Sequence, residues 1–314
     1  MRRLGHRFPA SRIVVSSCRH FGSNLIRKEG AGFSRLVKFD TGGQMLCRGT
    51  DSIALASTMH YFLGTITGQD EDERPVLNLL RRAVRPGDTV LDIGANLGFY
   101  SFFLAPLCGK TGAVHAFEAN PILIPHLRHS AALNEAIANI TVNPVAVGSE
   151  TNKELRLYDP ERIGGSSLHR LPWLDSSKSV IVPMTTIDEY RRTQGISRID
   201  VVKIDIEGAE LDAFRGMDES FTVCPPKLIV CELALMIAPG QDQRPPPASI
   251  RGVYAAQIME FLHSRNYEPH YIEADGEVGL RVDAGELVPM QQNLINVAFV
   301  HRTLRQARPD LFRA

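Results

Sequence analysis

The chain has 314 residues, 44% of them hydrophobic and 22% charged, a composition typical of a soluble globular protein without a membrane-spanning segment. Lys and Arg number 35, and so do Asp and Glu, so the formal net charge is zero. Nucleic-acid affinity comes largely from phosphate neutralisation, and the lack of a basic excess therefore argues against a nucleic acid as the partner.

The N-terminal segment is basic. Residues 1–28 contain seven Arg or Lys and no acidic residue, which fits either a transit peptide or a basic, poorly ordered terminus. We expect a basic, poorly ordered terminus. The five cysteines form no CxxC pair, which favours a reducing compartment, and the expected location is the cytoplasm, with an organellar transit peptide as the alternative.

The remaining chain divides into three parts. Residues 29–69 have short mixed segments with glycines and are expected to form a small β-rich extension. From residue 70 to residue 303 apolar strands alternate with helical patterns, and residues 304–314 form a C-terminal tail. The segment ITVNPVAVG is expected to be one strand. Strands such as VVKID and LIVCEL are continuously apolar, which indicates an α/β fold whose mostly parallel sheet has helices on both faces.

A tight turn follows the first strand of this domain, in TVLDIGANLGFYSFFLA. In open α/β sheets ligands bind at the carboxyl ends of the strands. Gly94 and Gly98 allow the backbone to bend, and Asn96 tolerates left-handed geometry. The spacing does not match the G-x-G-x-x-G fingerprint of nicotinamide cofactors, since Phe99 stands where its third glycine would fall.

The acidic residues around this turn favour a cationic ligand. Asp92 precedes the first glycine, where a carboxylate would repel a pyrophosphate. S-adenosylmethionine has an ammonium, a sulfonium and no phosphate. Its ribose requires an acid at the end of the next strand, where Glu118 stands. The pattern therefore predicts S-adenosylmethionine as the cofactor, although Asp92 would also suit a helix cap.

A second functional stretch is KIDIEGAE, where a buried strand enters a helix. Asp205 and Glu207 project to the same side, because side chains alternate along a strand. Three roles stay open: a general base for an acceptor hydroxyl, a divalent metal site, or a structural ion pair with Lys203. His169, in GGSSLHR, is a second candidate base, although such a histidine is more often a solvated loop residue.

Several of these motifs together resemble one known family. VLDIGANLGFYS, AFEANP, GGSSL, TTIDEY and VVKIDIEGAELDAFRGM are similar to the FkbM family of S-adenosylmethionine-dependent methyltransferases, with Ala119 as a departure where the family has proline. The resemblance implies a Rossmann-like class I methyltransferase fold with a seven-stranded sheet and an antiparallel last strand. It also implies methyl transfer to a hydroxyl of a small-molecule or glycan acceptor, such as a sugar or secondary metabolite. A non-catalytic binding protein that keeps this fold is the alternative.

The resemblance assigns roles to individual residues. The expected catalytic residues are Asp205, Glu207 and His169. The expected cofactor-binding residues are Glu73, Asp92, Gly94, Asn96, Gly98, Glu118, Asn120, Asn143 and Ala146. In this assignment Glu118 binds the ribose and Glu73 lies near the amino-acid end of the cofactor. Asn143 and Ala146 lie near the adenine. Glu73 would equally suit a helix start, and Asn120 a helix cap.

Overall fold

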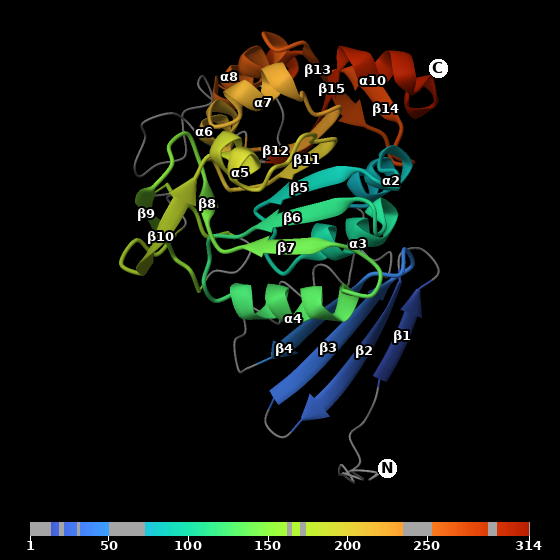
Figure 1. The fold of residues 1–314 in the computed structure, drawn as a ribbon, viewed down its shortest axis with the longest axis vertical. Helices are drawn as coiled ribbons and strands as arrows, with labels where there is room; N and C mark the ends of the chain where they lie inside the picture. The colour runs from blue at the N-terminus through green and yellow to red at the C-terminus, as the bar shows by residue number, and fades with distance from the viewer. Residues whose placement is uncertain are drawn as a thin grey trace.

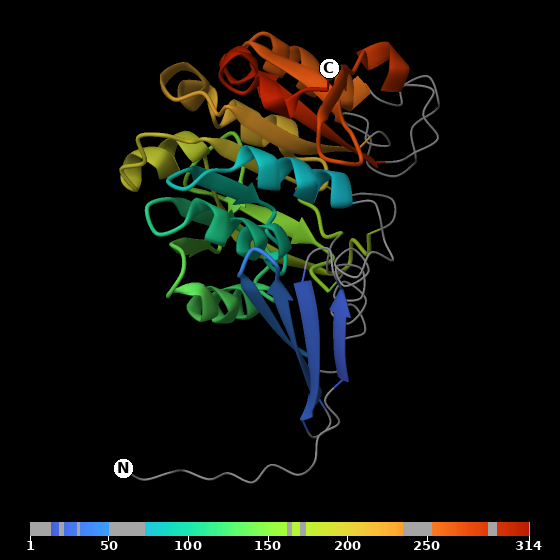
Figure 2. The same cartoon turned by 90° about the vertical axis from the view of Figure 1, so that its right-hand side faces the viewer.

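The computed structural model describes residues 14–18, 22–29, 32–49, 73–161, 165–169, 174–234, 253–287 and 294–313. The C-terminal three quarters of the chain form an α/β domain, and a separate antiparallel sheet precedes it (Figures 1 and 2). No helix among the described residues is long and apolar enough to cross a membrane.

The α/β domain is built on an eight-stranded sheet in the order β14-β13-β15-β12-β11-β5-β6-β7. Strands β5, β6, β7, β11 and β12 pair in parallel, whereas β15 runs antiparallel between β12 and β13. This confirms the mostly parallel sheet with an antiparallel last strand. The expected count of seven strands is exceeded by β14, which pairs with β13 at the edge. The bounds are β5 (Thr89–Ile93), β6 (Ala113–Phe117), β7 (Ile140–Asn143), β11 (Val201–Ile204), β12 (Leu228–Ala234), β13 (Tyr267–Ile272), β14 (Val278–Arg281) and β15 (Leu294–His301).

Helices cover both faces of this sheet, and each face has its own apolar core. Successive strand residues point to opposite faces, so Val90 joins one core and Leu91 the other. The first core contains residues of α2 (Arg74–Ala83), α3 (Phe99–Cys108), α4 (Ile124–Asn134) and α10 (Arg302–Ala307). The second contains residues of α5 (Ile187–Thr193), α6 (Glu210–Arg215), α7 (Asp218–Val223) and α8 (Val253–His263). Two short helices, α9 (Ala284–Leu287) and η2 (Pro309–Leu311), complete the described domain.

The segment expected to form one strand, residues 140–148, makes two. Strand β7 ends at Asn143, and β8 (Ala146–Val147) joins a second sheet with β9 (Lys153–Tyr158) and β10 (Ser179–Thr185). Pro144 lies between them, and a proline has no N–H to continue the ladder. The break places β8, β9 and β10 beside the carboxyl ends of the main strands (Figure 1).

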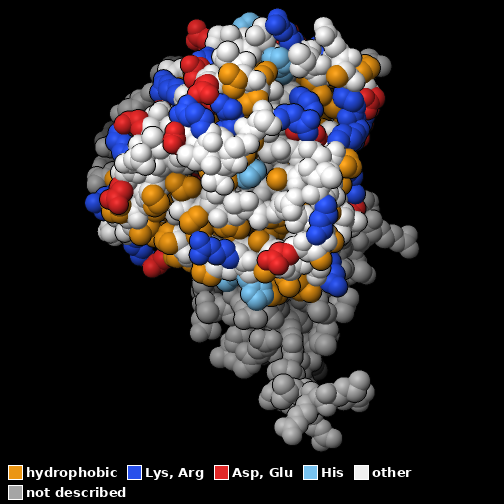
Figure 3. Space-filling view, in the orientation of Figure 1, with side chains coloured by type: hydrophobic (Ala, Val, Ile, Leu, Met, Phe, Trp, Pro, Cys, Tyr) orange, Lys and Arg blue, Asp and Glu red, His pale blue; other side chains and the backbone are white. Residues whose placement is uncertain are grey.

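The N-terminal sheet consists of β1 (Val14–Cys18), β2 (Gly22–Glu29), β3 (Gly32–Phe39) and β4 (Gln44–Gly49). Strands β1 and β2 thus lie largely within the residues expected to be poorly ordered. Strand β4 runs along α4, where the Gln44 and Leu46 amides donate to Asn134 and Ser130 at 2.8 and 2.9 Å. These contacts join the N-terminal sheet to the α/β domain. Charged side chains of both signs are interspersed over the face in Figure 3, as the balanced composition leads one to expect.

Candidate active site

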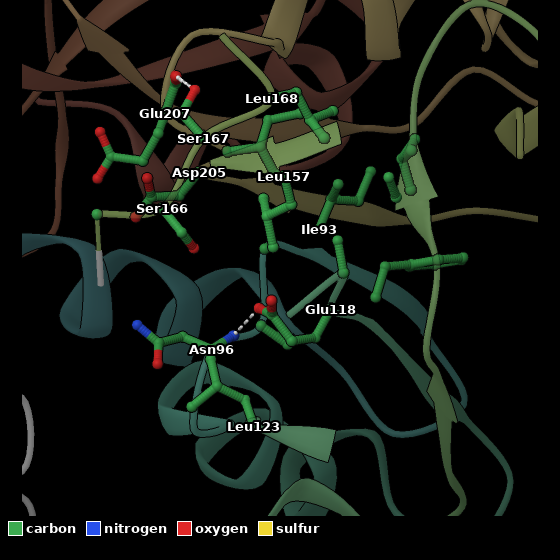
Figure 4. Close-up of a pocket in the computed structure, with 18 of the residues that line it drawn as sticks. Ile93, Asn96, Glu118, Leu123, Leu157, Ser166, Ser167, Leu168, Asp205 and Glu207 are labelled. Carbon is green, nitrogen blue, oxygen red and sulfur yellow. Dashed lines mark hydrogen bonds between the residues drawn. The ribbon is translucent and has the colours of Figure 1, made fainter. Parts of the chain in front are cut away.

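One cavity lies at the carboxyl ends of β5, β6 and β11, where an open α/β sheet places its ligand. It holds about 900 Å³ of empty space, counting the part open to solvent. Figure 4 shows side chains from these strand ends and from the segment 165–168 around it. The expected site residues that line it are Glu73, Gly94, Asn96, Glu118, Ala146, Asp205 and Glu207.

The glycine turn after β5 forms one wall of the cavity. Gly94 and Asn96 have φ values of 85° and 52°, in the left-handed region. A side chain at Gly94 is excluded, because its Cβ would lie 1.8 Å from the carbonyl oxygen of Asp205. Gly98 does not line the cavity but begins α3 with a φ of 87°. The turn thus packs directly against the backbone that follows β11.

Glu118 is fixed by the backbone on both carboxylate oxygens. Oε2 accepts from the Asn96 amide at 2.8 Å, and Oε1 accepts from the Asn120 amide at 2.7 Å. The residue is buried, and burial raises the pKa of its carboxyl to about 7, although these backbone bonds act to lower it. Each oxygen still has a lone pair with which to accept a further hydrogen bond.

Asp92 lies beneath the glycine turn. It is only 2% exposed and accepts a hydrogen bond from the Ser101 hydroxyl on α3. Burial raises the pKa of its carboxyl to about 6, against the opposing effects of Ser101 and Lys203. Asp92 is not part of the cavity lining, so in this structure it supports the turn from behind.

Three other expected residues lie outside the lining. Asn120 is buried, with Oδ1 accepting from the Ile122 amide and Nδ2 donating to the carbonyl of Pro160. Helix α4 begins only at Ile124, so Asn120 closes the turn before the helix. Asn143 donates to the Ala116 carbonyl at 3.2 Å. His169 is exposed.

The turn from Asp205 to Gly208 forms the facing wall, and it is held from two sides. Glu207 has a φ of 52°, and its carbonyl accepts from the buried Ser167 hydroxyl at 2.7 Å. The carboxylate of buried Glu210 accepts from the amides of Ile206 and Gly208 at 3.2 and 3.1 Å. Sequence reasoning had chosen His169 from the GGSSLHR segment, whereas Ser167 is the residue that contacts the turn.

An acidic cluster surrounds Lys203 behind this turn. Lys203 is 2% exposed, and its Nζ lies 3.6 Å from Oδ2 of Asp205 and 5.1 Å from the centre of the Tyr100 ring. The Tyr100 hydroxyl donates to Glu73. Burial acts to lower the pKa of Lys203, but the neighbouring carboxylates prevail and raise it. These carboxylates, called the acidic cluster below, are Asp205, Glu73, Glu232 and Asp92.

Glu232 was not among the residues expected from the sequence. It lies within β12, whose Cys231 pairs with Ile204 of β11, so the register places Glu232 beside Asp205, the residue that follows β11. Burial and, next, the charge of Asp205 raise the pKa of the Glu232 carboxyl, whereas Lys203 acts to lower it. The sequence signal was a single carboxylate inside the apolar run LIVCELAL.

A metal-assisted role for the two carboxylates had been left open from the sequence. Within the described ranges, no group of three or more His, Cys, Asp or Glu side chains is arranged to hold a metal ion.

Comparison with known proteins identifies the family. Residues 92–269, more than half of the chain, match the model of the methyltransferase FkbM domain. A hexuronic acid methyltransferase, AglP of Haloferax volcanii, is 28% identical over 145 residues, which cover 46% of this chain and 56% of AglP. The 31-O-demethyl-FK506 methyltransferase FkbM of Streptomyces tacrolimicus is 25% identical over 166 residues, covering 44% of this chain and 62% of that protein.

A third relative, the methyltransferase sdnD of Sordaria araneosa, is 26% identical over 157 residues, covering 41% of this chain and 60% of sdnD. The chain thus spans about three fifths of the length of the curated relatives that it matches. The matched region contains the glycine turn after β5 and the turn from Asp205 to Gly208, which form the two facing walls of the cavity, and it also contains Glu232. The expectation drawn from the motifs is confirmed: the chain belongs to the FkbM methyltransferase family and has the class I methyltransferase fold.

Proposed function

We propose that this protein is an S-adenosylmethionine-dependent methyltransferase that methylates a hydroxyl group of a sugar, a glycan or a secondary metabolite. One observation carries the proposal. The cavity places Glu118, a buried carboxylate suited to a ribose, on one wall and Asp205, a partly exposed carboxylate, on the other. A cofactor bound at the first wall would extend toward a proton acceptor at the second.

The residues of the cavity fit S-adenosylmethionine. Each oxygen of Glu118 can accept one more hydrogen bond, as two ribose hydroxyls require. The Oδ1 of Asn96 is buried and has no hydrogen-bond partner among the described residues, so it offers another acceptor. The apolar part of the lining, which suits a purine ring, is formed by Phe117, Leu123, Val145, Ala146, Val147 and Leu157.

The protein's own contribution to catalysis is alignment and proton removal. S-adenosylmethionine supplies a methyl group that its sulfonium already activates, so correct alignment of the acceptor provides much of the rate. Asp205 accepts the proton of the acceptor hydroxyl. The Nζ of Lys203 lies 3.6 Å from Oδ2 of Asp205 and forms an ion pair with it at the cavity wall. His169 is the weaker candidate, because it is exposed and does not line the cavity.

The acceptor class rests on the relatives. Two of them are named for a hexuronic acid, which has hydroxyls beside its carboxyl group, and for 31-O-demethyl-FK506, whose name indicates a free oxygen at position 31. The carboxylates of Asp205 and Glu207 on the cavity wall suit hydroxyl donors of such a compound. We accordingly expect a small-molecule or glycan acceptor and not a nucleic acid.

The test is transfer of a labelled methyl group. Purified protein is incubated with methyl-labelled S-adenosylmethionine and a panel of neutral sugars, uronic acids and hydroxylated lipids or polyketides. We expect label in at least one hydroxylated acceptor, and loss of that label in Asp205→Asn. Absence of transfer to the whole panel, in protein that still binds S-adenosylhomocysteine, would instead favour a non-catalytic binding protein.

A further inference from the structure

The acidic cluster has more carboxylates than its one cation can neutralise. Four carboxylates interact electrostatically with Lys203, the Asp205 carboxylate at 3.6 Å from its Nζ, so full ionisation would leave a net charge of about −3 at the end of the strands. Asp92 and Lys203 are each 2% exposed and Glu73 is 8% exposed, whereas Asp205, with 34% of its side chain exposed, and Glu232 are only half-buried. Uncompensated like charges in such a place are costly, and a proton is the simplest way to remove one.

The geometry identifies where that proton is shared. Asp205 and Glu232 follow directly after paired residues of β11 and β12, on neighbouring parallel strands. Among the described residues, the Nζ of Lys203 forms an ion pair with Asp205 and none with Glu232. Burial and the neighbouring charge of Asp205 both raise the pKa of the Glu232 carboxyl, which favours a proton on this member of the pair.

Other titratable groups also face this pair from the elements packed around it. They are Glu73 before α2, Asp92 on β5, Tyr100 on α3, Glu207 and Glu210 after β11, and Cys231 on β12. Lys203 is the single cation among these described groups. A positively charged ligand that enters the cavity would therefore be attracted by carboxylates that outnumber the one neighbouring cation.

We propose that Asp205 and Glu232 share a proton that leaves when the cationic methyl donor binds, and that the same pair receives the acceptor's hydroxyl proton during methyl transfer. The inference rests on the proposed function. It assigns to Glu232 a part in the reaction that the family's motifs do not mark.

The step balances in atoms and charge. The acceptor O–H bond breaks and its proton passes to a carboxylate of the pair, while the oxygen forms the new bond to the methyl carbon. The electrons of the former carbon–sulfur bond stay on sulfur, which becomes neutral. The cavity therefore loses one positive charge from sulfur and gains one as a proton, so the net charge around Lys203 does not change.

The proposal predicts different proton linkage for donor and product. S-adenosylmethionine and S-adenosylhomocysteine differ in the sulfonium charge but share the same ribose, adenine and amino-acid groups. Calorimetric titrations with each are run in phosphate and in Tris at the same pH, because the heat difference between buffers gives the number of protons released. The wild type should release about one proton more with S-adenosylmethionine than with S-adenosylhomocysteine. The affinity for the donor, relative to that for the product, should therefore rise about tenfold per pH unit.

Glu232→Gln keeps the shape of the protonated carboxyl and should abolish this difference while retaining binding of S-adenosylhomocysteine. Asp205→Asn, a second variant of the same pair, should do the same. Glu260→Gln, at an exposed position on α8, is the matched control and should behave as the wild type. Equal proton release for the two ligands in the wild type, or a difference that persists in both variants, would overturn the proposal. If neither ligand binds the wild type, the proposed function fails, and this inference fails with it.

Discussion

The hydroxyl of Ser167 donates a 2.7 Å hydrogen bond to the backbone carbonyl of Glu207. This bond ties the segment beside the cavity to the turn that carries Asp205. The same turn is held from the opposite side by the buried carboxylate of Glu210, and Gly94 packs against its backbone. The position of the proposed base thus depends on residues from three separate parts of the chain.

Removal of the Ser167 hydroxyl should loosen this turn. The Ser167 hydroxyl also accepts from the His169 amide at 3.1 Å, so we expect Ser167→Ala to lower the free energy of unfolding by about 1–2 kcal/mol, the usual net value of two hydrogen bonds. Amide hydrogen exchange should increase in the peptide that contains residues 205–208. Ser166→Ala is the control, because Ser166 lines the same cavity but is not the donor to Glu207. Equal exchange in the two variants would show that the bond does not hold the turn.

Gly94 should not tolerate a side chain. The Cβ of Gly94→Ala would lie 1.8 Å from the Asp205 carbonyl oxygen, and the backbone would also be strained at φ 85°. Gly195→Ala separates the two effects, since Gly195 has a φ of 64° but no heavy atom within 4 Å of an added Cβ. Chemical denaturation should show a loss of about 1 kcal/mol for Gly195→Ala and more than about 3 kcal/mol for Gly94→Ala. Similar losses of unfolding free energy in the two variants would mean that the Asp205 backbone moves away from the added methyl group at little cost in stability.

The carboxylate of Glu118 should be needed for cofactor binding. In Glu118→Gln the amide nitrogen must face the N–H of either Asn96 or Asn120, and the charged acceptor for the ribose is lost. We expect the Kd for S-adenosylhomocysteine to rise about 10- to 100-fold, as for the loss of one charge-assisted hydrogen bond. Titration calorimetry measures this, with Glu154→Gln on the exposed side of β9 as the control. An unchanged Kd would place the ribose elsewhere.

Glu210 should make stability depend on pH. Burial raises the pKa of its carboxyl from 4.5 to about 7, so the folded state binds this proton more tightly than the unfolded state. The resulting stability is fully present below pH 4.5 and is lost as the pH rises through 7. The amide of Glu210→Gln cannot titrate but can still accept from the two backbone amides through its oxygen.

The free energy of unfolding of Glu210→Gln, relative to the wild type, should therefore increase by about 3 kcal/mol between pH 4.5 and pH 7. Urea denaturation of both proteins across this range provides the measurement. If the difference in unfolding free energy between the two proteins does not change with pH, Glu210 keeps its ordinary pKa in the folded protein.

Much of the site followed from local patterns in the sequence. The strand–turn–helix pattern around Gly94 and the carboxylate at Glu118 predict a ligand site because each feature lies within one strand and its turn. The period of two places Asp205 on the side that lines the cavity. These residues meet because the carboxyl ends of parallel strands share one edge of the sheet.

Other features depend on contacts between distant segments, which no local pattern contains. The hydroxyl of Ser167 and the carboxylate of Glu232 gain their roles only when the chain brings them to Asp205 and the turn after it. The second sheet arises because Pro144 interrupts a strand whose other residues favour continuation. Strand β14 lies at the sheet edge beside β13 and has only four residues, so its sequence signal is weak.

The most direct test of the central claim is a calorimetric titration of the purified protein with S-adenosylhomocysteine, and with NAD as the control ligand. The account predicts saturable binding of S-adenosylhomocysteine at one site per chain and no binding of NAD. Binding of NAD alone, or of neither ligand, would contradict it.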